Sequence, residues 1–290
     1  MNLCVRTDAC GNDPERVAQY CEGLGIREVW SFPEFAEGYG ADGLMAADGL
    51  RAYEEQWRRR GLHLAMVSEM VDDADLASDP GAQAKIARLR SVLTAMQAAE
   101  VEALFVVLNI RAAGAEAERE AQWRRLAAIC RDAAAHAETT TGRRLVYHGH
   151  QTPEHLVFRA AELERLLSLA PSPANGITFC TGCLQLAGDD LGGWVERFGT
   201  ERIFFVHMRD VRARPDGGFD EVRFGEGEVA LGTVVERLRA IGYDGPICPE
   251  HIPRVAYDPH EEISTAWGLG YLRALLANDA GAPARPGQRR

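Results

Sequence analysis

The sequence predicts one α/β domain folded as a single (β/α)8 (TIM) barrel. Short apolar runs alternate with longer helical stretches eight times along the 290 residues, with no change of composition that marks a domain boundary. The runs are continuously apolar, which is typical of parallel strands buried on both faces. A doubly wound sheet is the alternative, and the lack of a Gly-x-Gly-x-x-Gly turn disfavours it. We expect the barrel over residues 1–278 and a disordered tail, rich in Pro, Gly and Arg, over 279–290.

Each repeat supplies one strand and one helix. The predicted strands cover residues 3–6, 26–30, 62–67, 103–108, 144–148, 176–180, 202–207 and 246–250. The first helix begins at Asp13 and Pro14, because Asp caps free amide groups and Pro fits the first turn. The other predicted helices cover residues 46–60, 80–99, 116–137, 160–169, 189–198, 229–241 and 261–277, and a long loop precedes the seventh of the eight.

The composition excludes several classes of protein. Acidic residues outnumber basic ones by 43 to 32, a formal net charge of −11, so nucleic acid is not an expected partner. No apolar run approaches the roughly 20 residues that span a bilayer, and residues 1–6 show no secretory signal. The seven cysteines are therefore expected as reduced thiols. We expect a cytoplasmic homo-oligomer with no membrane partner.

The last four predicted strands each end in a residue type that binds transition metals. Functional groups of such barrels lie at the C-terminal ends of strands, and here these ends carry His148, Cys180, His207 and Glu250. Nitrogen, sulfur and oxygen donors together suit Mn, Fe, Co or Zn. Each residue alone has an ordinary interpretation as a polar or small buried side chain. Four consecutive strands that end this way favour a metal site.

Cys180 and Cys183 also form a Cys-x-x-Cys motif, which occurs in thioredoxin-like redox sites and in zinc sites. The sequence holds no second such motif, which excludes a four-cysteine zinc site. Spacing alone leaves redox chemistry open. Cys183 lies three residues past the strand end and need not touch a metal.

Other strand ends supply candidates for proton transfer and substrate binding. His251 directly follows Glu250, so one side chain can bind a metal while the other faces a substrate as an acid or base. Glu69 follows the third strand and His150 the fifth, and both are candidates for substrate binding. His150 is also the second choice of metal ligand, after His148.

Arg209 is a candidate for binding a substrate carboxylate. It lies two residues beyond His207 and therefore shares the side of the strand on which that residue lies. A guanidinium there can hold a carboxylate through two hydrogen bonds. An ion pair with Asp210 or Glu250 is the alternative, and the sequence does not separate the two.

At these positions the sequence resembles the mannonate dehydratase family, within the wider group of xylose isomerase-like barrels. The most specific segment is Thr-x-Cys-Thr-Gly at residues 178–182, in which only the first cysteine of the Cys-x-x-Cys motif matches. The other segments are Phe-Val-His-Met-Arg-Asp-Val at 205–211, Pro-Glu-His at 249–251 and Gly-Leu-Gly-Tyr-Leu-Arg at 268–273. The similarity is specific over residues 140–277 and looser before them.

The resemblance implies that His148, Cys180, His207 and Glu250 bind Mn²⁺ or Fe²⁺, and that redox chemistry of the thiols is not the function. It also implies that His251 is the catalytic acid or base. The position of the family's catalytic tyrosine falls on His260, with Tyr257 close enough in sequence to replace it. The family's Asp-His-Gly reads Glu-His-Ile at residues 250–252, and its aspartates after the fifth strand and histidine in the seventh loop are absent.

The activity that the resemblance implies is loss of water from D-mannonate or a related aldonate, giving a 2-keto-3-deoxy acid. A sugar isomerase, an epimerase or a lyase acting on a keto-sugar is the alternative, since these reactions use the same metal-stabilised enediol. A barrel that keeps the metal but serves only in binding or regulation is a third class, which His251 argues against. The net charge of −11 and a thiolate ligand disfavour phosphodiester cleavage.

Overall fold

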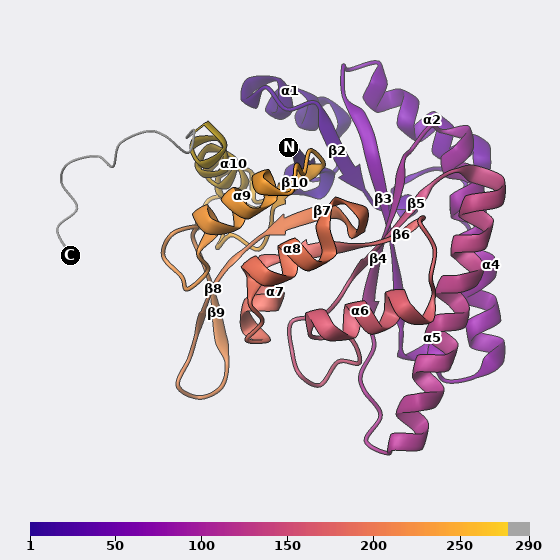
Figure 1. The fold of residues 1–290 in the computed structure, drawn as a ribbon. Coiled ribbons are helices and arrows are strands. Elements are labelled where there is room, and N and C mark those ends of the chain that lie inside the picture. The colour runs from indigo at the N-terminus through magenta and orange to yellow at the C-terminus, as the bar shows by residue number, and fades with distance from the viewer. Residues whose placement is uncertain (278–290) are drawn as a thin grey trace.

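Eight parallel strands form the centre of the computed structural model, which describes residues 1–277 (Figure 1). They are β1 (Asn2–Arg6), β2 (Glu28–Ser31), β3 (His63–Asp72), β4 (Ala103–Asn109), β5 (Arg144–His148), β6 (Asn175–Cys180), β7 (Ile203–Met208) and β10 (Pro246–Pro249). They pair in the order β1-β10-β7-β6-β5-β4-β3-β2, and β2 pairs with β1 to close the barrel. The predicted (β/α)8 barrel is confirmed.

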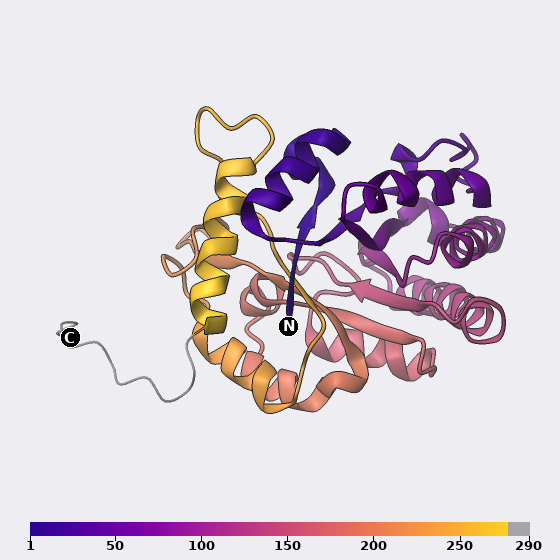
Figure 2. The ribbon, with the colours of Figure 1, turned by 90° about the horizontal axis from the view of Figure 1, so that it is seen from above.

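The helices form an outer ring around these strands, as the view from above shows (Figure 2). The long ones are α1 (Pro14–Leu24), α2 (Ala47–Arg58), α4 (Asp79–Ala98), α5 (Glu116–His136), α6 (Ala160–Leu169), α8 (Leu191–Arg202), α9 (Leu231–Ala240) and α10 (Glu262–Ala277). Short helical segments are η1 (Thr7–Cys10), η2 (Pro33–Phe35), α3 (Asp73–Leu76), η3 (Ala137–Thr141) and α7 (Thr181–Leu186). The predicted start of α1 is confirmed, since Asp13 accepts a hydrogen bond of 2.8 Å from the Arg16 amide.

Apolar side chains fill two separate layers of the barrel. Every second residue of each strand points outward, packs against the helices and contributes to the larger core. The residues between them point inward, where Trp30, Phe105 and Phe205 pack with ring centroids 5.2 to 6.2 Å apart. This aromatic layer closes the interior below the C-terminal strand ends.

Two features of the fold differ from the prediction. Strand β3 continues to Asp72, five residues past its predicted end, because it pairs with the whole of β4. The long loop after β7 contains an antiparallel hairpin of β8 (Asp210–Ala213) and β9 (Phe219–Val222). The Asp210 carboxylate fixes the chain that follows by accepting hydrogen bonds from the amides of Gly225, Gly227 and Val229.

The predicted tail over residues 279–290 lies outside the described residues. Within residues 1–277, no helix has both the length and the apolar character needed to cross a membrane.

Asp258 determines where α10 begins. Its buried carboxylate accepts hydrogen bonds from the amides of Glu262, Ile263 and Ser264, three groups that have no partner inside the helix. The loop between β10 and α10 is therefore anchored at its C-terminal end.

We predict that Asp258→Ala lowers the free energy of unfolding by about 2 kcal/mol, the upper end for loss of a capping side chain, because three amides lose their acceptor. Urea denaturation measures the change. The control is Asp244→Ala, at an exposed carboxylate, which should change stability by less than about 0.5 kcal/mol. Equal stability of the two variants would contradict the role of Asp258.

Candidate metal centre and active site

The four predicted metal ligands converge at the C-terminal mouth of the barrel. One ligand atom from each of His148, Cys180, His207 and Glu250 lies within 4.8 Å of the others. The first two end β5 and β6, and Cys180 is the register partner of His207 on β7. Glu250 follows β10 directly and donates its amide to the Met208 carbonyl at 3.0 Å. Adjacent parallel strands thus bring all four residues together.

The cluster leaves donor atoms without partners. The Nε2 atoms of His148 and His207 are buried and have no hydrogen-bond partner among the described residues. Such atoms are costly in a protein interior unless something binds them. The set of two imidazoles, one thiol and one carboxylate is one that divalent transition metals accept.

Strong electrostatic coupling holds the cluster together. His207 Nδ1 lies 2.7 Å from Glu250 Oε2, and His207 is fully buried. Burial alone would lower the pKa of His207, but the Glu250 carboxylate and the Cys180 thiolate raise it to about 9. Burial opposes ionisation of Glu250, yet His207 and His251 hold its pKa well below the usual range. At neutral pH the cluster therefore contains an ion pair.

Cys180 is also held in its charged form. Burial opposes its ionisation, but the neighbouring Cys183 thiol, the charge of Arg209 and the adjacent imidazoles of His148 and His207 keep its pKa well below the usual value. The pKa of Cys183 is raised well above its usual value by its hydrogen bond to Cys180 and by burial. Cys180 is thus the thiol suited to bind a metal, and Cys183 stays protonated beside it as a hydrogen-bond donor.

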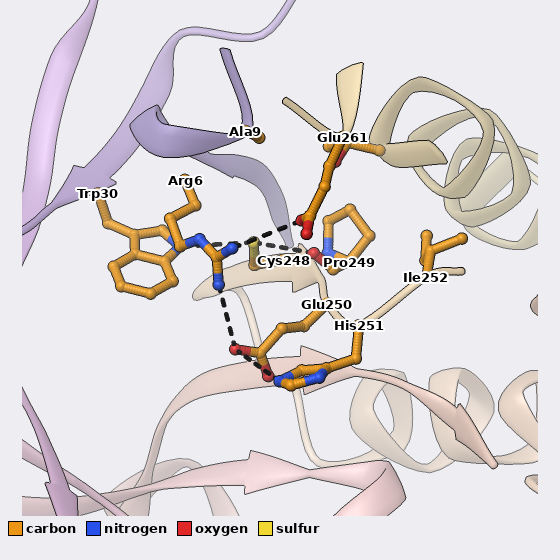
Figure 3. A pocket seen from close by; sticks show the side chains of 10 residues that line it. Arg6, Ala9, Trp30, Cys248, Pro249, Glu250, His251, Ile252 and Glu261 are labelled. Atoms are coloured by element: carbon orange, nitrogen blue, oxygen red, sulfur yellow. Dashed lines mark hydrogen bonds and ion pairs between the residues drawn. The ribbon is translucent and has the colours of Figure 1, made fainter. Parts of the chain in front are cut away.

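His251 faces the cavity beside the cluster (Figure 3). Its Nε2 lies 3.8 Å from Glu250 Oε1 and its Nδ1 lies 3.7 Å from Glu221 Oε1. The side chain is 44% exposed, unlike those of the cluster. Burial lowers the pKa of His251, and Arg209 adds to this effect while Glu250 opposes it. An imidazole that is neutral at pH 7 can accept a proton from a bound molecule.

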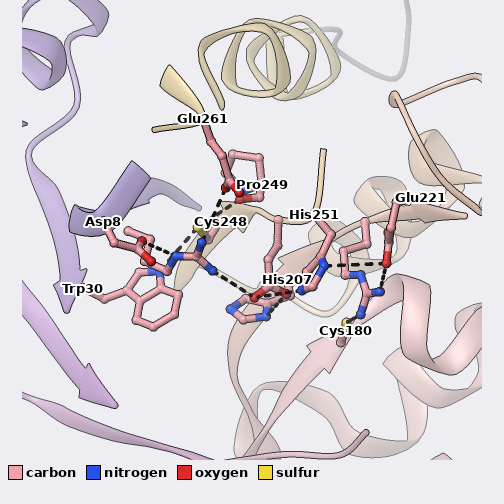
Figure 4. Close-up of polar contacts among 12 residues, drawn as sticks. Asp8, Trp30, Cys180, His207, Glu221, Cys248, Pro249, His251 and Glu261 are labelled. Carbon is pink, nitrogen blue, oxygen red and sulfur yellow. Dashed lines mark hydrogen bonds and ion pairs between the residues drawn. The ribbon is translucent and has the colours of Figure 1, made fainter. Parts of the chain in front are cut away.

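Arg209 is not free to bind a substrate carboxylate, which corrects that expectation. Only 1% of the residue is exposed, and its Nη1 donates to Cys183 Sγ at 3.2 Å. Its Nη2 donates to Gln151 Oε1 at 3.1 Å and forms an ion pair with Glu221 on β9 (Figure 4). The ion-pair partner is therefore neither Asp210 nor Glu250.

Two charged residues of the site were missed from the sequence. Arg6 ends β1, and its Nη1 lies 3.9 Å from Glu250 Oε1 while its Nη2 lies 3.5 Å from Glu261 Oε2. The position of Arg6 at a strand end was a usable signal. Glu221 lies in the hairpin, where no local pattern indicates contact with Arg209.

Glu69 is not at the mouth of the barrel, which corrects its assignment to substrate binding. Its register partner is Val106, a member of the core between strands and helices. Its carboxylate accepts a hydrogen bond of 2.9 Å from the Tyr39 hydroxyl and lies 3.8 Å from Lys85 Nζ. Lys85 also lies 3.3 Å from Asp75, so Glu69 belongs to a buried charged network between β3 and α4.

Three further predicted residues lie outside the four-residue cluster. His150 stacks on His155 with ring centroids 3.5 Å apart, so it is not one of the four ligand candidates. Tyr257 is 91% exposed. The ring of His260 covers Gly11, where an added Cβ would lie 3.1 Å from it. The loop before α10 therefore holds both predicted replacements of the family's tyrosine away from the cluster.

Residues 13–275 match the family model described as xylose isomerase-like TIM barrel, and the chain belongs to this family. Within it, the chain is similar to the mannonate dehydratase of Enterococcus faecalis, with 39% identity over 118 residues. These cover 40% of this chain and 32% of the relative, so the match spans about a third of that protein.

Solved structures show the same fold. The mannonate dehydratase from Streptococcus suis serotype 2 superposes with a TM-score of 0.79 at 18% identity, covering 100% of this chain and 99% of that one. D-psicose 3-epimerase from Clostridium cellulolyticum H10 gives a TM-score of 0.75 at 17% identity, covering 95% and 99%. The resemblance inferred from the strand-end motifs is confirmed by the sequence relatives, and these structures support the fold alone.

We predict that Lys85→Met lowers the free energy of unfolding by about 3–5 kcal/mol, because it leaves the carboxylates of Glu69 and Asp75 buried without their cation. The matched control is Glu69→Gln, which keeps an acceptor for Tyr39 and should cost clearly less. Chemical denaturation of both variants at pH 7 gives the comparison. If the Lys85→Met protein is as stable as the unaltered one, the structural role of Glu69 is contradicted and a functional role has to be considered again.

Proposed function

We propose that this protein is a divalent-metal-dependent sugar-acid dehydratase, a lyase that removes water from D-mannonate or a related aldonate to give a 2-keto-3-deoxy acid. The observation that carries the proposal is the cluster of four ligand-type residues beside the accessible imidazole of His251. The sequence similarity to mannonate dehydratases supports the choice of reaction.

His148, Cys180, His207 and Glu250 would hold the metal, with Mn²⁺ or Fe²⁺ as the proposed ion. The unpartnered Nε2 atoms of both histidines support the fit. Glu250 replaces a shorter Asp of the family, and its carboxylate still reaches His207 Nδ1 at 2.7 Å. A divalent cation at this point supplies positive charge where negative charge develops in the reaction.

The chain's own residues must move two protons. In the dehydration, the bond from C2 to hydrogen breaks and a base takes the proton, while the hydroxyl on C3 leaves as its oxygen is protonated. The enol that remains becomes the 2-keto-3-deoxy acid by a further proton shift. We assign one of these transfers to His251, a choice supported by its exposure to the cavity and its distance of 3.8 Å from Glu250.

A sugar isomerase or epimerase, or a keto-sugar lyase, remains the second candidate, and one observation favours it. Tyr257 is 91% exposed and His260 packs over Gly11, so neither is at the cluster to serve as a second acid or base. The deciding experiment incubates Mn²⁺-loaded protein with D-mannonate and measures 2-keto acid, beside a panel of aldoses and ketoses. Turnover of a sugar but not of mannonate would replace the dehydratase by this candidate.

We predict that Cys180→Ala and His207→Ala each lose most of the bound divalent metal, because each removes one of four ligands. Elemental analysis of protein purified with Mn²⁺ or Fe²⁺ in the buffers measures it. Cys183→Ala is the matched control and should retain the metal. Full occupancy in both ligand variants would refute the site. If His148→Ala alone retains the metal, His150 is the metal ligand in place of His148.

We predict that His251→Gln keeps the metal but lowers kcat by about 10²–10⁴-fold, the usual loss for a missing acid or base. Steady-state kinetics on the converted substrate, together with metal analysis, separate the two properties. Tyr257→Phe and His260→Phe are the comparison variants. If His251→Gln remains fully active while either comparison variant is inactive, the loop before α10 supplies the catalytic group.

A further inference from the structure

A second polar pocket opens at the mouth of the barrel, at the ends of β3, β4 and β5. Its volume is about 510 Å³, within the range of small-molecule sites. The polar side chains that line it are Asp72, Asp73, Asn109, Arg111, His150 and His155. The reaction proposed above uses none of them.

Arg111 presents an unengaged guanidinium on a fixed backbone. Its amide donates to Asp73 Oδ1 at 2.7 Å, and its carbonyl accepts from Gln122 Nε2 at 2.8 Å. Its main chain also bridges His155. The guanidinium forms no hydrogen bond or ion pair with any of residues 1–277. Arg6 and Arg209, at the same mouth, are both paired with carboxylates.

Two neighbouring side chains also keep free polar atoms. His150 Nδ1 is buried without a hydrogen-bond partner, although its ring is held in place by stacking on His155. The Asn109 amide makes one weak contact, 3.7 Å to Met70 Sδ. Polar side chains with unused donors and acceptors are what a site for hydroxyl groups requires.

The register places this pocket next to the metal cluster. Val107 is the partner of His148, Asn109 follows Val107 two residues later on the same side of β4, and His150 lies two residues past His148, just beyond the end of β5. Two residues of a strand rise about 6.6 Å, comparable with the length of the whole carbon chain of an extended hexonate. Asp72 is the register partner of Asn109, so it lies beside Asn109 at the same level of the barrel.

We propose that this pocket binds the hydroxyl groups at C4 to C6 of a six-carbon substrate whose carboxylate end lies at the cluster. Asp72 and Asp73 contribute two carboxylates against the one guanidinium of Arg111, and both accept backbone amides. The pocket therefore has no excess of positive charge, which favours neutral hydroxyls over a second carboxylate or a phosphate. This inference rests on the proposed function for the orientation of the substrate.

The test compares aldonates of six, five and four carbons that share the configuration of D-mannonate at C2 and C3. Arg111→Gln should lower kcat/KM for the six-carbon acid by about 10–100-fold, the effect of losing a charged hydrogen-bond donor. The four-carbon acid, too short to reach the pocket, should change less than about threefold. Asn109→Ala should give a smaller loss with the same dependence on chain length.

Arg124→Gln is the matched control, an exposed arginine on the outer helix α5. It should leave all three values unchanged, and metal content and melting temperature should be the same in every variant. Equal losses on the long and short acids in Arg111→Gln would overturn the inference. So would stronger competition by inorganic phosphate than by polyols, which would make the pocket an anion site.

Failure of the proposed function is recognised separately. If the unaltered protein does not dehydrate mannonate, calorimetric titration of the Mn²⁺-loaded protein with linear polyols of four to six carbons replaces the kinetic test. If the affinity for polyols rises with their chain length in the unaltered protein but not in Arg111→Gln, the pocket binds hydroxyl groups even though the protein is not a mannonate dehydratase. Affinity independent of chain length overturns it.

Discussion

The convergence of four parallel strand ends on one point is the constraint on which the rest of the site depends. Parallel strands in a closed barrel all end at the same mouth, and the register of β6 and β7 places Cys180 beside His207. The His207 and Glu250 side chains, 2.7 Å apart and largely buried, are tolerable there only because each neutralises the other. A metal at this point would engage the donors that the protein leaves unpaired.

Around the cluster, Arg209 supports it and leaves substrate binding to other residues. Both terminal nitrogens of its guanidinium are engaged, by the two thiols, the Gln151 amide and Glu221, so Arg209 stabilises negative charge on Cys180 and joins the hairpin to the barrel. This engagement removes the obvious cation from substrate binding. Arg111, which has a fixed backbone and an unengaged side chain, is then the cation left at the mouth within residues 1–277 for an incoming molecule.

The sequence predicted the residues whose position follows from strand order alone and failed where position depends on register or tertiary contact. The four ligand candidates lie at or directly after strand ends, and their convergence needs no side-chain detail. Glu69 was misplaced because β3 was predicted to end at residue 67 and continues to Asp72, which turns Glu69 toward α4. Contact between Glu221 and Arg209 depends on a hairpin that no local apolar pattern indicates.

His251 shows how the backbone itself brings two adjacent side chains to one cavity. In an extended strand, neighbours point to opposite faces, so Glu250 and His251 would diverge if β10 continued. The strand instead ends at Pro249, and His251 adopts a left-handed conformation with φ of +55°. That conformation costs a residue with a Cβ on the order of 1 kcal/mol. The turn leaves Glu250 at the buried cluster and His251 beside it but open to solvent, the separation that ligation and proton transfer require.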